Sequence, residues 1–158
     1  MNAKKISWIY SASLLGILGW LGAIWLAPYL RSRGAPLGKF IYLCFSPICH
    51  QIPARSFSFV GYPLAVCARC LGIYFGFLAG MVLYPFVRGF STVRLPKARV
   101  FLAFTAPIVV DTVANFFHLW ETSNVLRLSL GFLWGSLLPF YFMTGLAELA
   151  LKGIKHIE

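Results

Sequence analysis

The four cysteines of the chain fall in one short window, and a histidine stands beside one of them. They are Cys44, Cys49, Cys67 and Cys70, with His50 directly after Cys49. A soft transition metal such as zinc is held by thiolate and imidazole ligands that converge from separate segments, and a Cys-x-x-Cys motif supplies two of them. The spacing therefore predicts a zinc-like site built from Cys67, Cys70 and either Cys49 or His50.

The same cysteines also fit redox chemistry. Cys67 and Cys70 lie at the expected start of a helix and flank an arginine, and both features lower the pKa of a thiol. In an oxidising compartment Cys67 could pair with Cys70, and Cys44 with Cys49. A further interpretation makes them small buried side chains. His50 has no role in a simple disulfide staple, so the sequence favours the metal slightly.

Asp111 is an acidic residue inside an apolar run, where an ionised group is costly and usually has a specific partner. Asn115 follows one helical turn later and His118 two turns later, so the three form a polar stripe. The cations available to the carboxylate are Arg55, Arg69 and Arg127. Both a structural ion pair and an acid–base role agree with this pattern.

An active site built from these residues would have three groups. The catalytic group is Asp111, Arg69 and Arg127, and the metal ligands are Cys49, His50, Cys67 and Cys70. An anionic substrate, such as a lipid phosphate, would contact Arg55, Gln51, Asn115 and Asn124. Arg127 falls in the first turn of an expected helix, where a cation is unfavourable unless an acidic residue or an anionic ligand pairs with it.

The elements that must position these groups are strongly apolar. Hydrophobic residues make up 59% of the 158-residue chain and charged residues only 11%, too few to cover a soluble domain. Four runs are long enough to cross a bilayer: 7–30, 69–87, 99–120 and 125–151. The Cys/His-rich loop 31–68 contains a short interfacial or re-entrant segment at 37–48. The sequence therefore predicts an all-α integral membrane bundle of about four helices, forming one domain over residues 1–158.

Glycines at a spacing of four predict which helices pack together. They are Gly72, Gly76 and Gly80 in the second run, and Gly131 and Gly135 in the fourth. Small residues one turn apart allow two membrane helices to approach closely. We therefore expect the second and fourth helices to be neighbours.

The net charge of +10 resides in residues that flank the apolar runs. This placement indicates contact with lipid headgroups and leaves no soluble basic module for nucleic acid. With four spans, one face receives Lys4, Lys5, Arg88, Arg94, Lys97, Arg99, Lys152 and Lys155, and the other receives Arg31, Arg33, Lys39, Arg55 and Arg127. The more basic face is expected to be cytoplasmic. Both termini are then cytoplasmic, and the cysteines lie near the outer face.

Three segments resemble a known family, the predicted membrane proteins called domain of unknown function 2085. They are CHQIPARSF at 49–57, VCARCLGIYFG at 66–76, and Asp111 followed by ETSNVLR at 121–127 with Gly131 and Gly135. The resemblance covers roughly residues 40–136. It implies a bacterial or archaeal multi-helix membrane protein and brings no activity with it. Cys44 is not part of the pattern, which favours Cys49, His50, Cys67 and Cys70 as the ligand set.

Three functions remain compatible with the sequence. The first is a metal-dependent membrane protein, in its fullest form an enzyme acting on an anionic or lipid substrate. The second is a membrane thiol–disulfide oxidoreductase that uses Cys67 and Cys70. The third is a non-catalytic accessory or transport subunit whose cysteines form structural disulfides.

Overall fold

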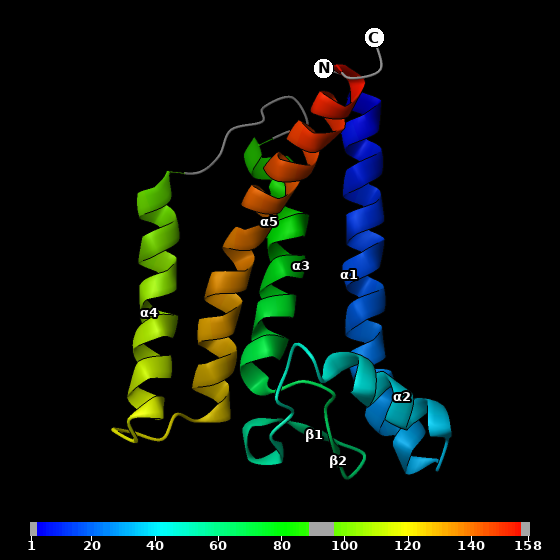
Figure 1. Ribbon diagram of the computed structural model, residues 1–158, viewed down its shortest axis with the longest axis vertical. Helices are drawn as coiled ribbons and strands as arrows, with labels where there is room; N and C mark the ends of the chain where they lie inside the picture. Colours follow the sequence, from blue (N-terminus) through cyan, green and yellow to red (C-terminus); the bar gives the residue numbers. More distant parts are fainter. Residues whose placement is uncertain (1–2, 89–96, 156–158) are drawn as a thin grey trace.

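The computed structural model describes residues 3–88 and 97–155 as a bundle of long helices (Figure 1). Its elements are α1 (Ala3–Ser32), α2 (Pro36–Phe45), η1 (Pro53–Arg55), β1 (Ser58–Phe59), β2 (Tyr62–Pro63), α3 (Ala68–Arg88), α4 (Ala98–Phe116) and α5 (Asn124–Lys155). Four of them, α1, α3, α4 and α5, are long and apolar enough to cross a membrane. The predicted all-α membrane bundle is confirmed.

Helix α4 ends earlier than expected, at Phe116 instead of residue 120. His118 adopts the left-handed conformation with a φ of 54°. The backbone amide of Leu119 donates to the carbonyl of Ala114 at 2.9 Å, and the backbone amide of His118 donates to the carbonyl of Asn115 at 3.3 Å. This pair of bonds is a Schellman motif, which usually has glycine in the left-handed position. Apolar residues continue past it, so hydropathy alone did not reveal the helix end.

Helices α3 and α5 pack backbone to backbone through their glycines. A Cβ atom added to Gly72, Gly76 or Gly80 would overlap the carbonyl oxygens of Leu128, Phe132 and Ser136 respectively, and one on Gly131 or Gly135 would overlap those of Arg69 and Ile73. Any larger side chain would have to separate the two helices. The predicted pairing of the second and fourth membrane helices is confirmed.

A short helix and a small hairpin cover one end of α1. Helix α2 crosses it at Gly38, where an added Cβ would come within 3.1 Å of the Ala27 carbonyl oxygen. Its outward side carries exposed Leu37, Phe40 and Leu43. At ten residues it is too short to span a bilayer, and this apolar side agrees with the predicted interfacial segment. Strands β1 and β2 pair antiparallel as a two-residue ladder.

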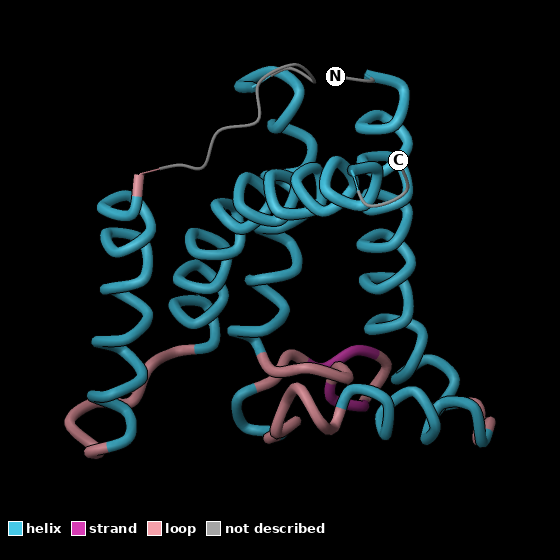
Figure 2. Tube along the Cα trace, turned by 45° about the horizontal axis from the view of Figure 1, so that its top comes forward, coloured by secondary structure: helices cyan, strands magenta, loops and turns pink. Residues whose placement is uncertain are grey.

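The α1–α2, α2–α3 and α4–α5 connections lie at one end of the bundle, which we call the hairpin end. Figures 1 and 2 show α2, the β1–β2 hairpin and the α4–α5 connection there, with the start of α1 and the last turns of α5 at the opposite end. Both cysteine-bearing segments and residues 115–127 therefore share one end, as predicted. Arg94, used above to assign the orientation, lies outside the described residues.

Candidate functional site

Three cysteine side chains converge at the hairpin end. The sulfur atoms of Cys49, Cys67 and Cys70 all lie within 4.8 Å of one another, with Cys49 buried and the other two half-buried. Thiolates bound to a tetrahedral zinc at about 2.3 Å are about 3.8 Å apart. The three sulfurs thus need to move only slightly inward to bind one ion.

The start of α3 holds two of these sulfurs. Cys67 caps the helix, because its carbonyl accepts the first helical hydrogen bond from the amide of Leu71 at 2.9 Å, and Cys70 lies less than one turn further on. The amide of Cys67 donates to the Cys49 sulfur at 3.1 Å. Hydrogen bonds from Cys49 and Cys70 lower the pKa of the Cys67 thiol. The backbone and the neighbouring thiols thus favour the thiolate form of Cys67, which is the form that binds metals.

Gln51 joins the two cysteine-bearing segments. Its side-chain amide donates to the carbonyl of Tyr42 and to that of Ala65, both at 2.8 Å, and its own backbone is left-handed with a φ of 51°. These bonds hold the turn that carries Cys49 against the strand leading to Cys67. The contacts give Gln51, expected above to bind substrate, a role in positioning the sulfurs.

Two neighbours of the cluster lie apart from it. His50 and Cys44 are both exposed. Among residues 3–88 and 97–155, neither belongs to the group of side chains that could hold one metal ion. The adjacent Cys49 is buried, so the two residues of the Cys-His pair face different surroundings. All four cysteines are free thiols, and the structure therefore does not support the disulfides expected between Cys67 and Cys70 or between Cys44 and Cys49.

Asp111 is the centre of a second polar group beside the sulfurs. It is only 3% exposed and forms an ion pair with Arg69, which lies between the two cysteines of the Cys-x-x-Cys motif. The Thr122 hydroxyl, the Trp120 indole N–H at 3.4 Å and the Asn115 amide at 3.2 Å all donate to its other oxygen. The carboxylate is thus fully engaged, which suits an orienting group better than a free base.

The sequence missed two of these donors and misplaced the carboxylate along the helix. The sequence assigned Thr122 no contact with Asp111 and placed Trp120 in the apolar run 99–120, but both lie in the connection that folds back over Asp111. Asp111 falls near the middle of the expected run 99–120, yet it is five residues from the last residue of α4, about 8 Å along the axis. His118, the third member of the expected stripe, is exposed and forms the helix end.

Arg127 extends the polar group to α5. It is only 9% exposed, and its guanidinium donates to the side-chain oxygens of Asn124 at 3.1 Å and Asn115 at 3.2 Å. The Asn124 amide donates in turn to the carbonyl of Ala54 at 3.3 Å, immediately before the exposed Arg55. The structure therefore brings Arg69, Arg127, Asn115 and Asn124 into one network around Asp111, and Arg69 lies in the same helical turn as Cys67 and Cys70.

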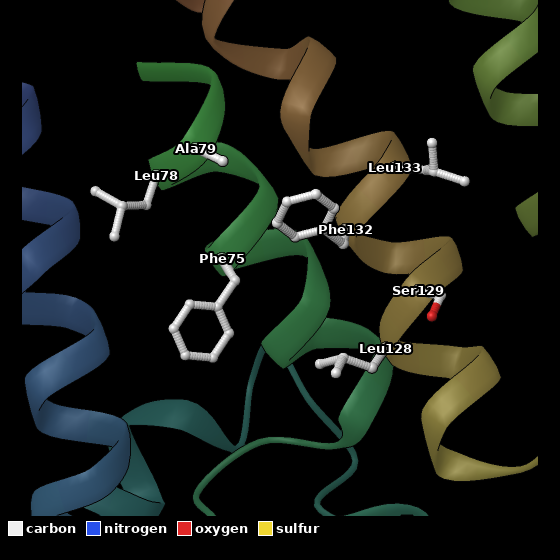
Figure 3. Close-up of a pocket in the computed structure, with 7 residues that line it drawn as sticks. All are labelled: Phe75, Leu78, Ala79, Leu128, Ser129, Phe132 and Leu133. Atoms are coloured by element: carbon white, nitrogen blue, oxygen red, sulfur yellow. The ribbon is translucent and has the colours of Figure 1, made fainter. Parts of the chain in front are cut away.

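Two open cavities lie away from this network. One of about 560 Å³ runs between α3 and α5 and is lined almost entirely by apolar groups such as Phe75, Leu128 and Phe132, with the Ser129 hydroxyl at its edge (Figure 3). Such a surface suits a lipid acyl chain and offers nothing to bind a polar reactant.

Comparison with known proteins assigns the chain to a family. A family model described as "Predicted membrane protein (DUF2085)" matches residues 49–141, which include the three cysteines, Asp111 and Arg127. An uncharacterized protein of Methanocaldococcus jannaschii is 37% identical over 152 residues, covering 92% of this chain and 97% of that protein. Another from Methanothermobacter thermautotrophicus is 39% identical over 89 residues, covering 55% and 77% respectively. No solved structure matches. The chain belongs to this family of predicted membrane proteins, as the motifs at 49–57 and 66–76 indicated.

Proposed function

We propose that the protein binds a zinc-like transition-metal ion through Cys49, Cys67 and Cys70, with a fourth coordination position open to water or substrate. The observation that carries the proposal is the approach of three sulfurs from two segments to within 4.8 Å. Sulfur ligands select soft or borderline ions such as zinc. Three protein ligands with one open position are the pattern of catalytic zinc sites, whereas structural sites usually have four.

The surroundings favour such an ion. Three thiolates around a divalent cation carry one net negative charge, which the positive N-terminus of α3 stabilises. The backbone amide that donates to the Cys49 sulfur is the kind of contact that orients a metal ligand from outside the coordination shell. Arg69 adds a guanidinium within the same helical turn.

In its fullest form, the proposal is a membrane enzyme acting on an anionic or lipid substrate. The metal would supply a Lewis acid or an activated water. Arg127 and Arg55 would bind the anionic group, and Asp111 would fix the position of Arg69 through their ion pair. The apolar groove between α3 and α5 is compatible with a substrate that has an acyl chain.

The expected orientation belongs to the same proposal. The N-terminal turns of α1 and the C-terminal turns of α5 lie at one end of the bundle, away from the hairpin end (Figure 1). Both termini would be cytoplasmic and the sulfur cluster would lie near the outer face. A reporter enzyme that is active only outside the cytoplasm, fused to the C-terminus, tests this orientation. Activity of that fusion would contradict a cytoplasmic C-terminus.

Metal analysis of the full-length protein, purified in detergent under reducing conditions, tests the site directly. We expect about one equivalent of a transition metal, and less than about a tenth of an equivalent would reject the proposal. Cys49→Ser and Cys67→Ser should each lose the metal. Cys44→Ser is the matched control, because Cys44 is exposed and outside the cluster, and it should keep the full equivalent.

A free-thiol count on the same sample separates the metal site from the redox alternative. A protein isolated without reductant that has no metal, and in which Cys67 and Cys70 react with a maleimide only after reduction, would be a dithiol oxidoreductase. Four reactive thiols after chelation, together with one bound ion before it, would support the metal site.

A further inference from the structure

We propose that Arg127, Arg55 and Arg69 form a binding site for a phosphate group at the hairpin end, beside the sulfur cluster. The group would belong to a lipid headgroup or to a small phosphorylated molecule. The inference deepens the proposed function, on which it rests for its link to the metal, because it names the anion that a substrate would carry. Its evidence is a charge imbalance that the sulfur cluster does not explain.

The first step is the unmatched charge of Arg127. The side chain is nine-tenths buried, yet the two acceptors that it reaches are neutral amide oxygens, on Asn115 and Asn124. Within the part of the chain that the structure describes, the ion pair at this end joins Asp111 to Arg69 instead. A buried cation without a counterion is costly, so a position of this kind usually meets an anion that is not part of the chain.

The second step is the number of cations around it. Arg55 and Arg69 are both close enough to act electrostatically on Arg127, and the carboxylate that opposes them is that of Asp111. Around Arg127, two further guanidinium groups and one carboxylate therefore lie within electrostatic range. Cys67 also lies within electrostatic range. A zinc-bound set of three thiolates would carry one negative charge, and a cationic excess would still remain.

The third step is the availability of donors. Arg69 has its Nε buried without a hydrogen-bond partner among the described residues, although its terminal nitrogen pairs with Asp111. Arg127 occupies the first turn of α5, where the helix dipole disfavours a cation but favours a bound anion. Guanidinium groups match the paired oxygens of phosphate, and a tetrahedral phosphate has enough oxygens to meet several of them at once.

The fourth step is access from the membrane surface. Arg55 ends η1 and is exposed, while η1 is tied to the first residue of α5 by the bond between Asn124 and the Ala54 carbonyl. The cluster therefore extends from the buried Arg127 outward to the surface at the end of the membrane helices. Lipid phosphates are found at this level of the bilayer.

The test is isothermal titration calorimetry on the full-length protein in neutral detergent at constant ionic strength. The probes are inorganic phosphate, a short-chain phosphatidic acid, and a diacylglycerol of the same chain length that lacks the phosphate. Saturable binding of inorganic phosphate identifies a site for free phosphorylated molecules. Saturable binding of phosphatidic acid alone identifies a headgroup site. Absence of saturable binding by both, or equal binding of the diacylglycerol, overturns the proposal.

Matched variants locate the site. Arg127→Gln and Arg55→Gln should each weaken binding by about tenfold or more, since each removes a charge-assisted contact. Arg33→Gln is the control, an exposed arginine at the same end whose contacts are with Tyr29, and its affinity should equal that of the wild type. If Arg127→Gln does not fold, the Arg55→Gln variant provides the test, because Arg55 is exposed. An affinity of Arg55→Gln equal to that of the wild type would contradict the site.

Metal content is measured on the same samples, so the two proposals fail separately. Saturable phosphate binding by a protein that never contains metal would contradict the metal site and leave the phosphate site standing. One equivalent of metal without saturable phosphate binding would contradict the phosphate site and leave the metal site standing.

Discussion

Helices α3 and α4 are both long and apolar, yet they join the rest of the bundle in opposite ways. Helix α3 meets α5 through five glycines whose hydrogens face carbonyl groups of the partner helix. Helix α4 stands to the side of α5 (Figure 1), and its buried residues are Asp111 and Ala114. One attachment depends on shape along the helix and the other on a few polar contacts.

The difference follows from the solvent. In a bilayer, burying an apolar side chain against another helix gains little over burying it in lipid, so association needs close backbone packing or interhelical polar contacts. The α3–α5 pair uses the first of these. Helix α4 uses the second, through the Asp111–Arg69 ion pair and a hydrogen bond from the Trp134 indole to Thr105 at 3.0 Å. The candidate site lies where the two kinds of contact meet.

The largest effect is expected from breaking the glycine interface with Gly76→Leu. Its side chain would collide with the Phe132 carbonyl, and the partner backbone cannot yield without separating the helices. We expect a loss of more than about 3 kcal/mol, or no folded protein, as measured by the monodisperse yield and the thermal midpoint. Gly19→Leu is the control, since an added Cβ there meets nothing within 4 Å. Equal stability of the two variants would contradict the close packing.

A smaller effect is expected from Asp111→Asn. The change leaves Arg69 without its counterion and should cost about 2 to 3 kcal/mol, less than for a fully buried pair because the Arg69 side chain is 23% exposed. Hydrogen exchange should accelerate in α4 and stay unchanged in α3. Removing both charges, with Arg69→Gln added, should cost less than removing Asp111 alone. A uniform acceleration across all helices would show that α4 is not attached separately.

The smallest effect is expected from Thr105→Val, which keeps the shape of the side chain and removes the acceptor of the Trp134 indole. We expect a loss of about 1 kcal/mol in the free energy of unfolding, measured by titration with a denaturing detergent. Thr112→Val on the same helix is the matched control. Among the residues that the structure describes, its hydroxyl bonds only to the Ile108 carbonyl of its own helix at 2.6 Å, so the stability should hardly change. If both variants lose the same free energy of unfolding, the hydrogen bond between Trp134 and Thr105 does not stabilise the attachment of α4.

Much of the fold could be predicted because a bilayer restricts what a chain can do. An apolar run of about twenty residues must be a helix, since lipid offers no partner to its backbone groups. Glycines at a spacing of four then identified the α3–α5 interface. The end of α4 could not be predicted in this way. It depends on His118 adopting a conformation that glycine normally takes, while Phe117 and Leu119 continue the apolar pattern.

The candidate site was partly predictable from residue types. Thiols and a buried acidic residue are conspicuous in a membrane protein. Their location at the same end of the bundle could be predicted from the number of membrane spans between them. The choice of Arg69 among three arginines as the partner of Asp111 depends on how α3 is rotated, which no local pattern shows. The roles of Thr122 and Gln51 depend on where the connecting segments fold back against the helices. The burial of Cys49 and the exposure of His50 depend on the conformation of a single turn.

The contact between Gly131 and the Arg69 carbonyl has a consequence for the exchange of the proposed ion. That carbonyl belongs to the turn carrying Cys67 and Cys70, and the neighbouring helix holds it in position whether or not an ion is bound. Small zinc domains unfold when a chelator removes the metal, because the ion supplies their folding free energy. Here a glycine on another helix preorganises two of the proposed ligands, Cys67 and Cys70. If the proposed ion is bound, a chelator should remove it and leave the bundle intact, ready to be reloaded.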